Sequence, residues 1–152
     1  MAINPNTDFS SGAVLTAAQQ NRFPRGVMAF GQASTTSNIT LTETTQITAS
    51  AFTAVANRYY RITYFEPAAA PAAGASSLIN LFIKNGATQL QTASVQNTGA
   101  TQAANGMTVQ LITTFSAGSV TLTARASGTV GSFLFRATGQ LAQLTVEDIG
   151  PS

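Results

Sequence analysis

The segment from Gly106 to Thr138 carries the longest regular alternation of apolar and polar residues in the chain. Apolar side chains fall at alternate positions 107, 109, 111 and 115 in the first run, over 120–126 in the second, and over 133–137 in the third. Such alternation is typical of strands buried on one face, because successive side chains of a strand point to opposite faces of the sheet. Short breaks that contain glycine separate the three runs. The segment therefore predicts three consecutive strands paired as an antiparallel meander.

Further strand patterns precede and follow this segment. They lie at residues 25–31, 39–49, 58–66, 78–84, 87–95 and 140–149. Asn85-Gly86, between two of them, suits a two-residue hairpin turn because both residues tolerate positive φ angles. No helical crossover separates the strands, so antiparallel sheets are expected. About eight strands of this kind predict an all-β fold, an antiparallel β-sandwich of jelly-roll type with a short N-terminal helical arm.

The residues before the first strand pattern predict that arm. Thr16 is a candidate N-cap for a helix from Ala17 to Arg22, and Pro24 ends it. Two helical turns are marginal alone in water, so the segment needs a docking surface. Its apolar groups for docking are Phe9, Val14, Leu15 and Phe23. Two interpretations stay open: an attachment arm, residues 1–24, that binds a neighbouring subunit beside a sandwich domain at 25–152, or a terminal helix folded onto its own domain.

The stretch RYYRITYFE, residues 58–66, is the most aromatic and β-branched of the strand candidates. One predicted face carries Tyr60, Ile62 and Tyr64, and the opposite face carries Tyr59, Arg61, Thr63 and Phe65. Because aromatic residues occupy both faces, the strand should lie centrally in a sheet or present one face to another chain. For the second case the expected subunit interface consists of Tyr59, Arg61 and Phe65.

Charged residues are unusually rare in this chain of 152 residues. Asp, Glu, Lys and Arg make up 8% of it, against about 25% in a typical soluble domain. Thr, Ser, Asn and Gln therefore supply most polar positions of the predicted strands. A neutral surface of this kind repels its own copies only weakly, which favours self-assembly. The alternative is a monomer with a threonine-rich sheet.

The few charges also bear on partners. Seven basic and five acidic residues give a net charge of +2, and the basic residues are scattered rather than clustered. Nucleic acid is therefore not an expected partner. No stretch approaches the roughly 18 consecutive apolar residues of a membrane span. The first residues also lack a basic region followed by an apolar run, so we expect neither a membrane partner nor a secretory signal.

The absence of His and Cys removes several kinds of catalytic site. Neither a Ser-His-Asp nor a Cys-His arrangement can be built, and the usual ligands of a zinc site are missing. Glycoside hydrolysis needs only two carboxylates, so it stays open as an alternative that would use Glu43 and Glu66. The adjacent acids Glu147 and Asp148 are too few for a calcium site. We predict no catalytic residues, no metal and no cofactor.

A carbohydrate site is a further hypothesis. The tyrosines offer stacking faces, and two polar loops, residues 67–77 and 97–105, offer hydrogen-bonding groups. The candidate ligand residues in these loops are Ser76, Ser77, Asn97, Thr98 and Asn105. The ligand class for such an adhesin would be a host surface glycan. The alternative places the tyrosines in the core or at an interface, with their hydroxyls at the rim.

Three motifs stand out when the chain is taken as a whole. They are SSGAVLTAAQQN at residues 10–21, RGVMAFG at 25–31 followed by FTAVANRYYRITYF at 52–65, and LTVEDIGPS at 144–152. Together they resemble a module of structural proteins of tailed bacteriophages, especially those that infect actinobacteria. The first motif is similar to the short adaptor segment that opens many minor tail and fibre-like proteins. The last resembles the closing strand of the same module.

The resemblance implies a non-enzymatic β-sandwich of jelly-roll type on the virion, exposed at its surface and assembled as a homotrimer. Its partners would be other virion proteins of the capsid or tail, and assembly would take place in the host cytoplasm. In larger tail proteins this module is a C-terminal domain, whereas here it stands almost alone. The alternatives are therefore a small tail-tip subunit, a fibre cap or a capsid decoration protein, with a glycan-binding adhesin as a further one.

Overall fold

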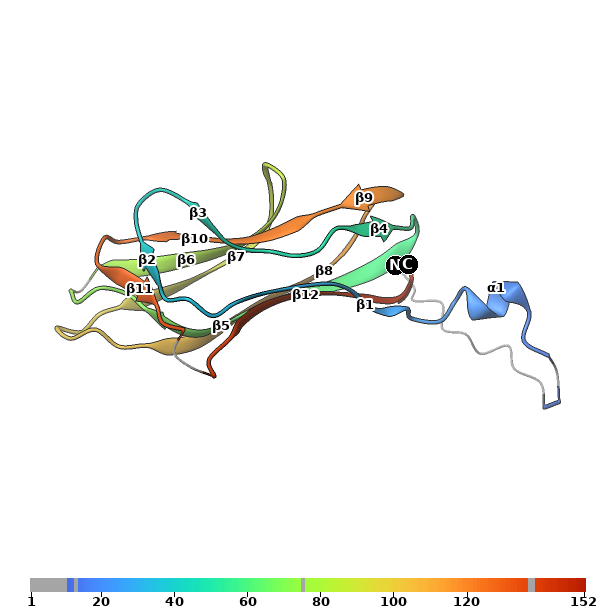
Figure 1. The fold of residues 1–152 in the computed structure, drawn as a ribbon, viewed down its shortest axis with the longest axis horizontal. Coiled ribbons are helices and arrows are strands. Elements are labelled where there is room, and N and C mark those ends of the chain that lie inside the picture. Colours follow the sequence, from blue (N-terminus) through green and yellow to red (C-terminus); the bar gives the residue numbers. More distant parts are fainter. Residues whose placement is uncertain (1–10, 13, 75, 137–138) are drawn as a thin grey trace.

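The computed structural model describes residues 11–12, 14–74, 76–136 and 139–152, which form an all-β fold with one short helix (Figure 1). The helix is α1 (Ala17–Gln20). The strands are β1 (Gly26–Ala33), β2 (Ser37–Ile39), β3 (Thr44–Thr48), β4 (Phe52–Ala54), β5 (Arg58–Ala70), β6 (Ser77–Asn85), β7 (Thr88–Asn97), β8 (Asn105–Thr114), β9 (Gly118–Val120), β10 (Leu122–Gly128), β11 (Ser132–Leu134) and β12 (Ala142–Pro151). The predicted all-β class is confirmed.

Two antiparallel sheets face one another in a sandwich-like arrangement (Figure 1). In the first sheet the strand order is β1-β12-β5-β8, and the short strands β11 and β2 extend it beside the last residues of β5. The second sheet has the order β3-β10-β6-β7, and β4 pairs with β9 at the end opposite β2 and β11. Every pairing between these strands is antiparallel, as the sequence predicted.

The core lies between the two sheets and follows the period-two pattern. On β5 the side chains of Tyr60, Ile62 and Tyr64 are fully buried, and on β6 those of Ile79, Leu81 and Ile83 are buried in the same way. Buried side chains alternate with more exposed ones along most of both strands. Each fully buried large apolar side chain contributes about 1.5–3 kcal/mol to stability. The central position predicted for residues 58–66 is confirmed, because β5 has β12 on one side and β8 on the other.

The predicted meander over residues 106–138 is wrong, although strands form in each of its three runs. β8 pairs with β5 in the first sheet, whereas β10 pairs with β3 and β6 in the second. β11 returns to the first sheet, between β5 and β2. The physical reason is that a strand of either sheet needs one apolar face toward the core, so the same alternation of apolar and polar residues suits both sheets. Consecutive strands can therefore cross from one sheet to the other instead of pairing with each other.

The predicted loop at 67–77 is shorter than expected. β5 continues through Pro67 to Ala70, and β6 begins at Ser77. The register of β5 against β8 shifts between Glu66 and Ala69. A proline is tolerated at such an irregularity because no regular ladder requires its missing N–H. Pro67 therefore marks a bulge within the strand, whereas Pro71 directly follows its last residue.

The hairpin between β6 and β7 also differs by one residue from the prediction. Asn85 pairs with Thr88, so the two turn residues are Gly86 and Ala87 rather than Asn85-Gly86. Gly86 has a φ angle of +58°, which glycine adopts without strain. Glycine at the first of two turn positions is a common solution for a tight hairpin.

The helix is only one turn long and ends before Arg22. The Thr16 hydroxyl accepts a hydrogen bond from the backbone N–H of Gln19 at 3.2 Å, and the Gln19 side chain accepts one from the backbone N–H of Thr16 at 2.9 Å. This reciprocal capping box confirms the predicted N-cap. A two-turn helical arm is not seen, since α1 ends at Gln20.

Candidate functional site

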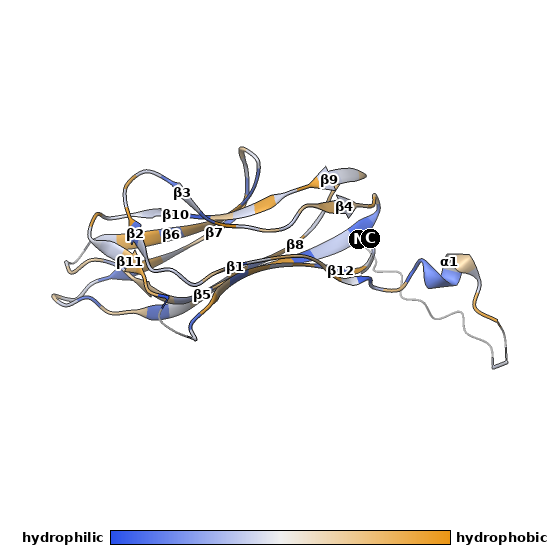
Figure 2. Ribbon diagram, viewed as in Figure 1, coloured by the Kyte–Doolittle hydropathy of each residue, from blue (hydrophilic) through white to orange (hydrophobic). Residues whose placement is uncertain are grey.

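The described part of the N-terminal segment projects beyond one end of the sandwich (Figure 1). Val14 is 89% exposed, and Leu15 and Phe23 are 38% and 40% exposed. Apolar residues precede α1 along this projection (Figure 2). Phe9, the fourth predicted attachment residue, lies outside the described residues. The three described side chains are thus available to a partner, and their attachment role stays a prediction.

The root of this segment is fastened to the sandwich by a buried arginine. Arg58, at the start of β5, donates from Nη1 to the carbonyl of Asn21 and from Nη2 to the carbonyl of Phe23, each at 2.6 Å. Its guanidinium also binds both carboxylate oxygens of Asp148 on β12. The Asp148 carboxylate accepts a further bond from the N–H of Gly150 at 2.9 Å. Sequence reasoning did not single out this pair.

Burial of Arg58 and Asp148 makes their hydrogen bonds depend on the position of the N-terminal segment. Arg58 is 4% exposed and Asp148 is 1% exposed, so neither charge is stabilised by bulk water. A buried ion pair tolerates this only when further hydrogen bonds satisfy both groups. The two carbonyls of the N-terminal segment supply part of that satisfaction for Arg58. The segment before β1 therefore leaves the domain in a defined direction.

A second buried ion pair lies toward the opposite end of the sandwich, between β5 and the residues that follow β11 in the first sheet. Arg136 binds both oxygens of the Glu66 carboxylate, at 2.7 and 3.0 Å, and the hydroxyl of Tyr64 donates to the same carboxylate at 2.8 Å. Burial, followed by the neighbouring negative charge of Glu66, raises the pKa of Tyr64 well above its ordinary value. The hydroxyl of Tyr64 therefore stays protonated at neutral pH and donates its hydrogen bond to Glu66.

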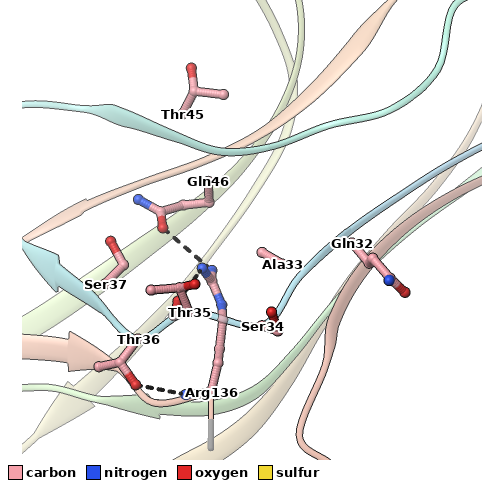
Figure 3. A pocket seen from close by; sticks show the side chains of 9 residues that line it. All are labelled: Gln32, Ala33, Ser34, Thr35, Thr36, Ser37, Thr45, Gln46 and Arg136. Carbon is pink, nitrogen blue, oxygen red and sulfur yellow. Dashed lines mark hydrogen bonds between the residues drawn. The ribbon is translucent and has the colours of Figure 1, made fainter.

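A surface pocket of about 480 Å³ lies above Arg136 (Figure 3). Its lining consists of Gln32, Ala33, Ser34, Thr35, Thr36, Ser37, Thr45, Gln46 and Arg136. The guanidinium of Arg136 extends between Thr35 and Gln46, bonding the carbonyl of Thr35 at 3.3 Å and the side-chain oxygen of Gln46 at 3.4 Å. Glu66 neutralises the arginine from below, so the pocket presents uncharged polar groups and little net charge.

The other described carboxylates are also paired with basic side chains. Glu43 binds Lys84 at 3.0 Å and Arg125 at 2.8 Å, and Glu147 binds Arg61 at 2.7 Å. The hydrogen bond from Lys84 lowers the pKa of Glu43. A glycosidase requires one carboxyl group with a raised pKa as its general acid. The lowered pKa of Glu43 does not fit the general-acid role that the hydrolase alternative would require of a carboxyl group.

The lowered pKa of Glu43 has a measurable effect on stability. The ion pairs contribute above the carboxyl's unfolded pKa, and their contribution is lost as the pH falls through the lower folded pKa. Glu43→Gln should cost less than about 1 kcal/mol at neutral pH, since the pairs are partly exposed. In urea titrations the difference from the unchanged protein should stay constant from about pH 7 to about pH 5 and shrink as the pH falls further. A difference that stayed constant with pH would contradict this assignment.

The predicted interface residues lie on the outer face of the first sheet. Arg61 is already paired with Glu147 across the strands, and Phe65 is 40% exposed. The strand register places Val27 and Ile112 in the same row as this pair, and both are exposed. Tyr59 lies on the same face of β5 and is partly buried. The structure thus gathers these side chains on one face, and their role as an interface stays a prediction.

The two predicted ligand loops meet at the end of the sandwich near β11. The N–H of Gly74 donates to the carbonyl of Gly99 at 3.0 Å, and the side-chain amide of Asn97 donates to the carbonyl of Ala72 at 3.0 Å. Asn97 and Ser77 are buried, whereas Ser76, Thr98 and Asn105 are exposed. Asn97 therefore holds the two loops together, and only the three exposed residues remain as candidate ligand groups.

Neither a metal-binding cluster nor a membrane-spanning helix is found in the described ranges. They contain no group of three His, Cys, Asp or Glu side chains placed to hold a metal ion. None of the helices in the same ranges has the length and apolar character needed to cross a bilayer.

Comparisons with known proteins add little to this picture. No family model matches the chain, and no curated protein matches it. Among solved structures, an arabinose-bound α-L-arabinofuranosidase is similar to it with 11% sequence identity and a TM-score of 0.34. The match covers 94% of this chain and 26% of that one, so the chain spans about a quarter of the enzyme's length. A likeness of this size establishes neither a family nor a function.

Proposed function

We propose that the chain is a non-enzymatic structural subunit of a bacteriophage virion, attached through its N-terminal segment and exposed at the virion surface through its sandwich. The observation that carries this proposal is the geometry of the segment. Its root is held by Arg58, while the apolar side chains of Val14 and Leu15 extend into solvent. The similarity of residues 10–21 to a phage adaptor segment indicates another virion protein as the partner.

The proposal includes a jelly-roll topology for the sandwich. Among the eight longer strands, β1 pairs with β12, β3 with β10, β5 with β8, and β6 with β7. The first strand thus pairs with the last, the second with the second to last, and so on inward. Such pairing supports a long hairpin wound into two facing sheets, the arrangement of jelly rolls in viral capsid and lectin domains.

A homotrimer associated with the tail or a fibre is the proposed assembly, and a capsid decoration protein that stabilises the head is the alternative. The scarcity of charge, 8% of residues, supports close contact between copies. Formation in the host cytoplasm and incorporation into the virion follow from the phage resemblance. A host glycan stays a proposed ligand for the exposed loop residues Ser76, Thr98 and Asn105.

The attachment role predicts a specific loss of assembly. Val14→Asp/Leu15→Asp should reduce incorporation into virions roughly tenfold or more, because charged groups replace apolar anchors worth more than about 1.4 kcal/mol. Incorporation is measured as copies per virion by quantitative mass spectrometry. Both residues precede the anchored root at Asn21 and Phe23, so the circular dichroism and unfolding midpoint of the domain should stay unchanged.

A matched control is available on the domain itself. Leu41 is 78% exposed and lies between β2 and β3, away from the N-terminal segment. Leu41→Asp introduces the same chemistry at an exposed apolar site and should leave incorporation unchanged. Normal incorporation of the Val14→Asp/Leu15→Asp variant would reject the attachment role.

A further inference from the structure

The two long sides of the sandwich are built differently. On the side of β1 and β3 the sheets close against each other: the N–H of Ser50 donates to the carbonyl of Phe30 at 3.1 Å, and the N–H of Phe30 donates to the hydroxyl of Ser50 at 3.3 Å. A Cβ atom on Gly31 would lie 2.7 Å from the carbonyl oxygen of Thr48, closer than such atoms pack. This side is therefore sealed by the chain's own backbone.

The opposite side, formed by β7 and β8, is open. Within the described part of the chain, β7 pairs with β6 alone and β8 pairs with β5 alone. Each of these ten-residue strands leaves one backbone edge without a strand partner. At about 3.3 Å per residue, each edge is roughly 33 Å long.

Neither edge carries a charge or a proline that would hinder pairing with another strand, although the register of β7 against β6 shifts between Ile83 and Lys84, near the hairpin. The sequences TQLQTASVQN of β7 and NGMTVQLITT of β8 contain no charged residue and no proline. Isolated edge strands commonly carry lysine, proline or a twisted bulge that prevents association with another strand. Two long edges without charge or proline on the same side suit a partner that supplies strands.

The rim of the core is also incompletely covered along the open side. Apart from Val109, which is buried, the inward-facing apolar residues here are only partly buried, unlike their counterparts on β5 and β6, and they comprise Leu90, Ala93, Val95, Met107 and Leu111. Covering them would remove further apolar surface from water, which contributes about 25 cal/mol per Å².

We propose that the open side is the contact surface between copies of this chain, with β7 of one copy pairing with β8 of the next around a threefold axis. The inference names the contact surface of the homotrimer proposed above and rests on that part of the proposed function. It differs from the outer-face interface of Tyr59, Arg61 and Phe65. A second copy is the favoured occupant because both edges are uncharged, so identical open sides meet without repulsion.

The strand directions allow this pairing. After the connection over residues 98–104 the chain reverses, so β8 runs opposite to β7 in the facing sheet. A threefold axis along the strands preserves the direction of each strand in every copy. β7 of one copy and β8 of its neighbour then run antiparallel, which is the pairing that their alternating hydrogen-bonding groups satisfy. Because the contact joins two different edges, it can close into a ring.

The inference is tested by placing charge on the two edges. Gln91 and Thr108 are exposed residues of β7 and β8, so Gln91→Lys/Thr108→Lys puts like charges where the edges would meet. The unchanged protein should sediment at three times the chain mass at micromolar concentration, and the variant should sediment as a monomer. Phe65→Lys, on the outer face, is the control and should keep the trimer mass.

Two outcomes would overturn the inference. One is a trimer that survives Gln91→Lys/Thr108→Lys and is lost in Phe65→Lys, which would assign the interface to the outer face. The other is an unchanged protein that stays monomeric, which would leave the attachment role to be judged by virion incorporation. Hydrogen exchange of the unchanged protein gives a second reading: the amides of β7 and β8 should become protected as concentration rises, and equal exchange at all concentrations would also reject the pairing.

Discussion

Arg136→Met is expected to lower the free energy of unfolding by about 3–5 kcal/mol, because it leaves the Glu66 carboxylate buried without its cation. Glu66 is fully buried, and Arg136 supplies two of the hydrogen bonds to its carboxylate. Tyr64 alone would remain as the hydrogen-bonding partner in this network. Methionine fills similar volume, so the loss reports the missing charge more than a cavity. Urea unfolding at neutral pH measures the effect.

The surface pair of Arg61 and Glu147 provides the matched control. Their side chains are separated by 2.7 Å, as in the buried pair, but are 44% and 34% exposed. Arg61→Met should therefore cost no more than about 1 kcal/mol. The double variant Glu66→Leu/Arg136→Met should recover much of the stability lost in Arg136→Met, since apolar pairs often replace buried ion pairs at little cost. Equal losses in Arg136→Met and Arg61→Met would show that burial does not decide the effect.

Gly128→Ala is expected to cost about 3 kcal/mol or more, because the added methyl group meets backbone on a neighbouring strand. Its Cβ atom would lie 2.3 Å from the carbonyl oxygen of Leu78 and 3.0 Å from the Cα atom of Ile79. Gly128 also donates its N–H to the carbonyl of Thr40 at 2.8 Å. β10 must therefore separate from β6 or lose this bond to make room. Thermal unfolding measures the loss.

Gly99→Ala is the control for this substitution. The nearest atom to its added methyl group is a side-chain oxygen of Asn97 at 3.4 Å, an ordinary contact distance. Gly99 is exposed, so the variant should stay within about 1 kcal/mol of the unchanged protein. A Gly128→Ala variant as stable as Gly99→Ala would mean that the two strands approach less closely than described.

The local pattern of the sequence was sufficient to predict most of the longer strands and their buried faces, but it merged β2 and β3 into one strand over 39–49. On β5 the alternation assigned Tyr60, Ile62 and Tyr64 to one face, and all three are fully buried. A period of two depends only on neighbouring residues, so it can be found without knowing the partner strand. The cap at Thr16 was predictable for the same reason, because its hydrogen bonds reach only to Gln19.

Partner choice and the buried ion pairs could not be predicted in this way. Arg58 and Asp148 are 90 positions apart, and Glu66 and Arg136 are 70 apart, so no local pattern connects them. The meander prediction failed because the alternation in β8 and β10 is equally suited to either sheet. The open side could not be predicted either. The sequence shows that β7 and β8 lack charged residues, but not that these strands lie at the edges of their sheets.

The central position of β12 determines when the molecule can fold. This strand lies between β1 and β5 in the first sheet, and its Asp148 completes the site that holds Asn21 and Phe23 through Arg58. It is also the last of the described strands to leave the ribosome. During synthesis, β1 and β5 therefore cannot complete their pairing until β12 has been made. Pairing of β12 with β1 joins residues that lie more than 100 positions apart in the sequence. Such long-range pairing is slow, so the domain should become protease-resistant only after β12 is released.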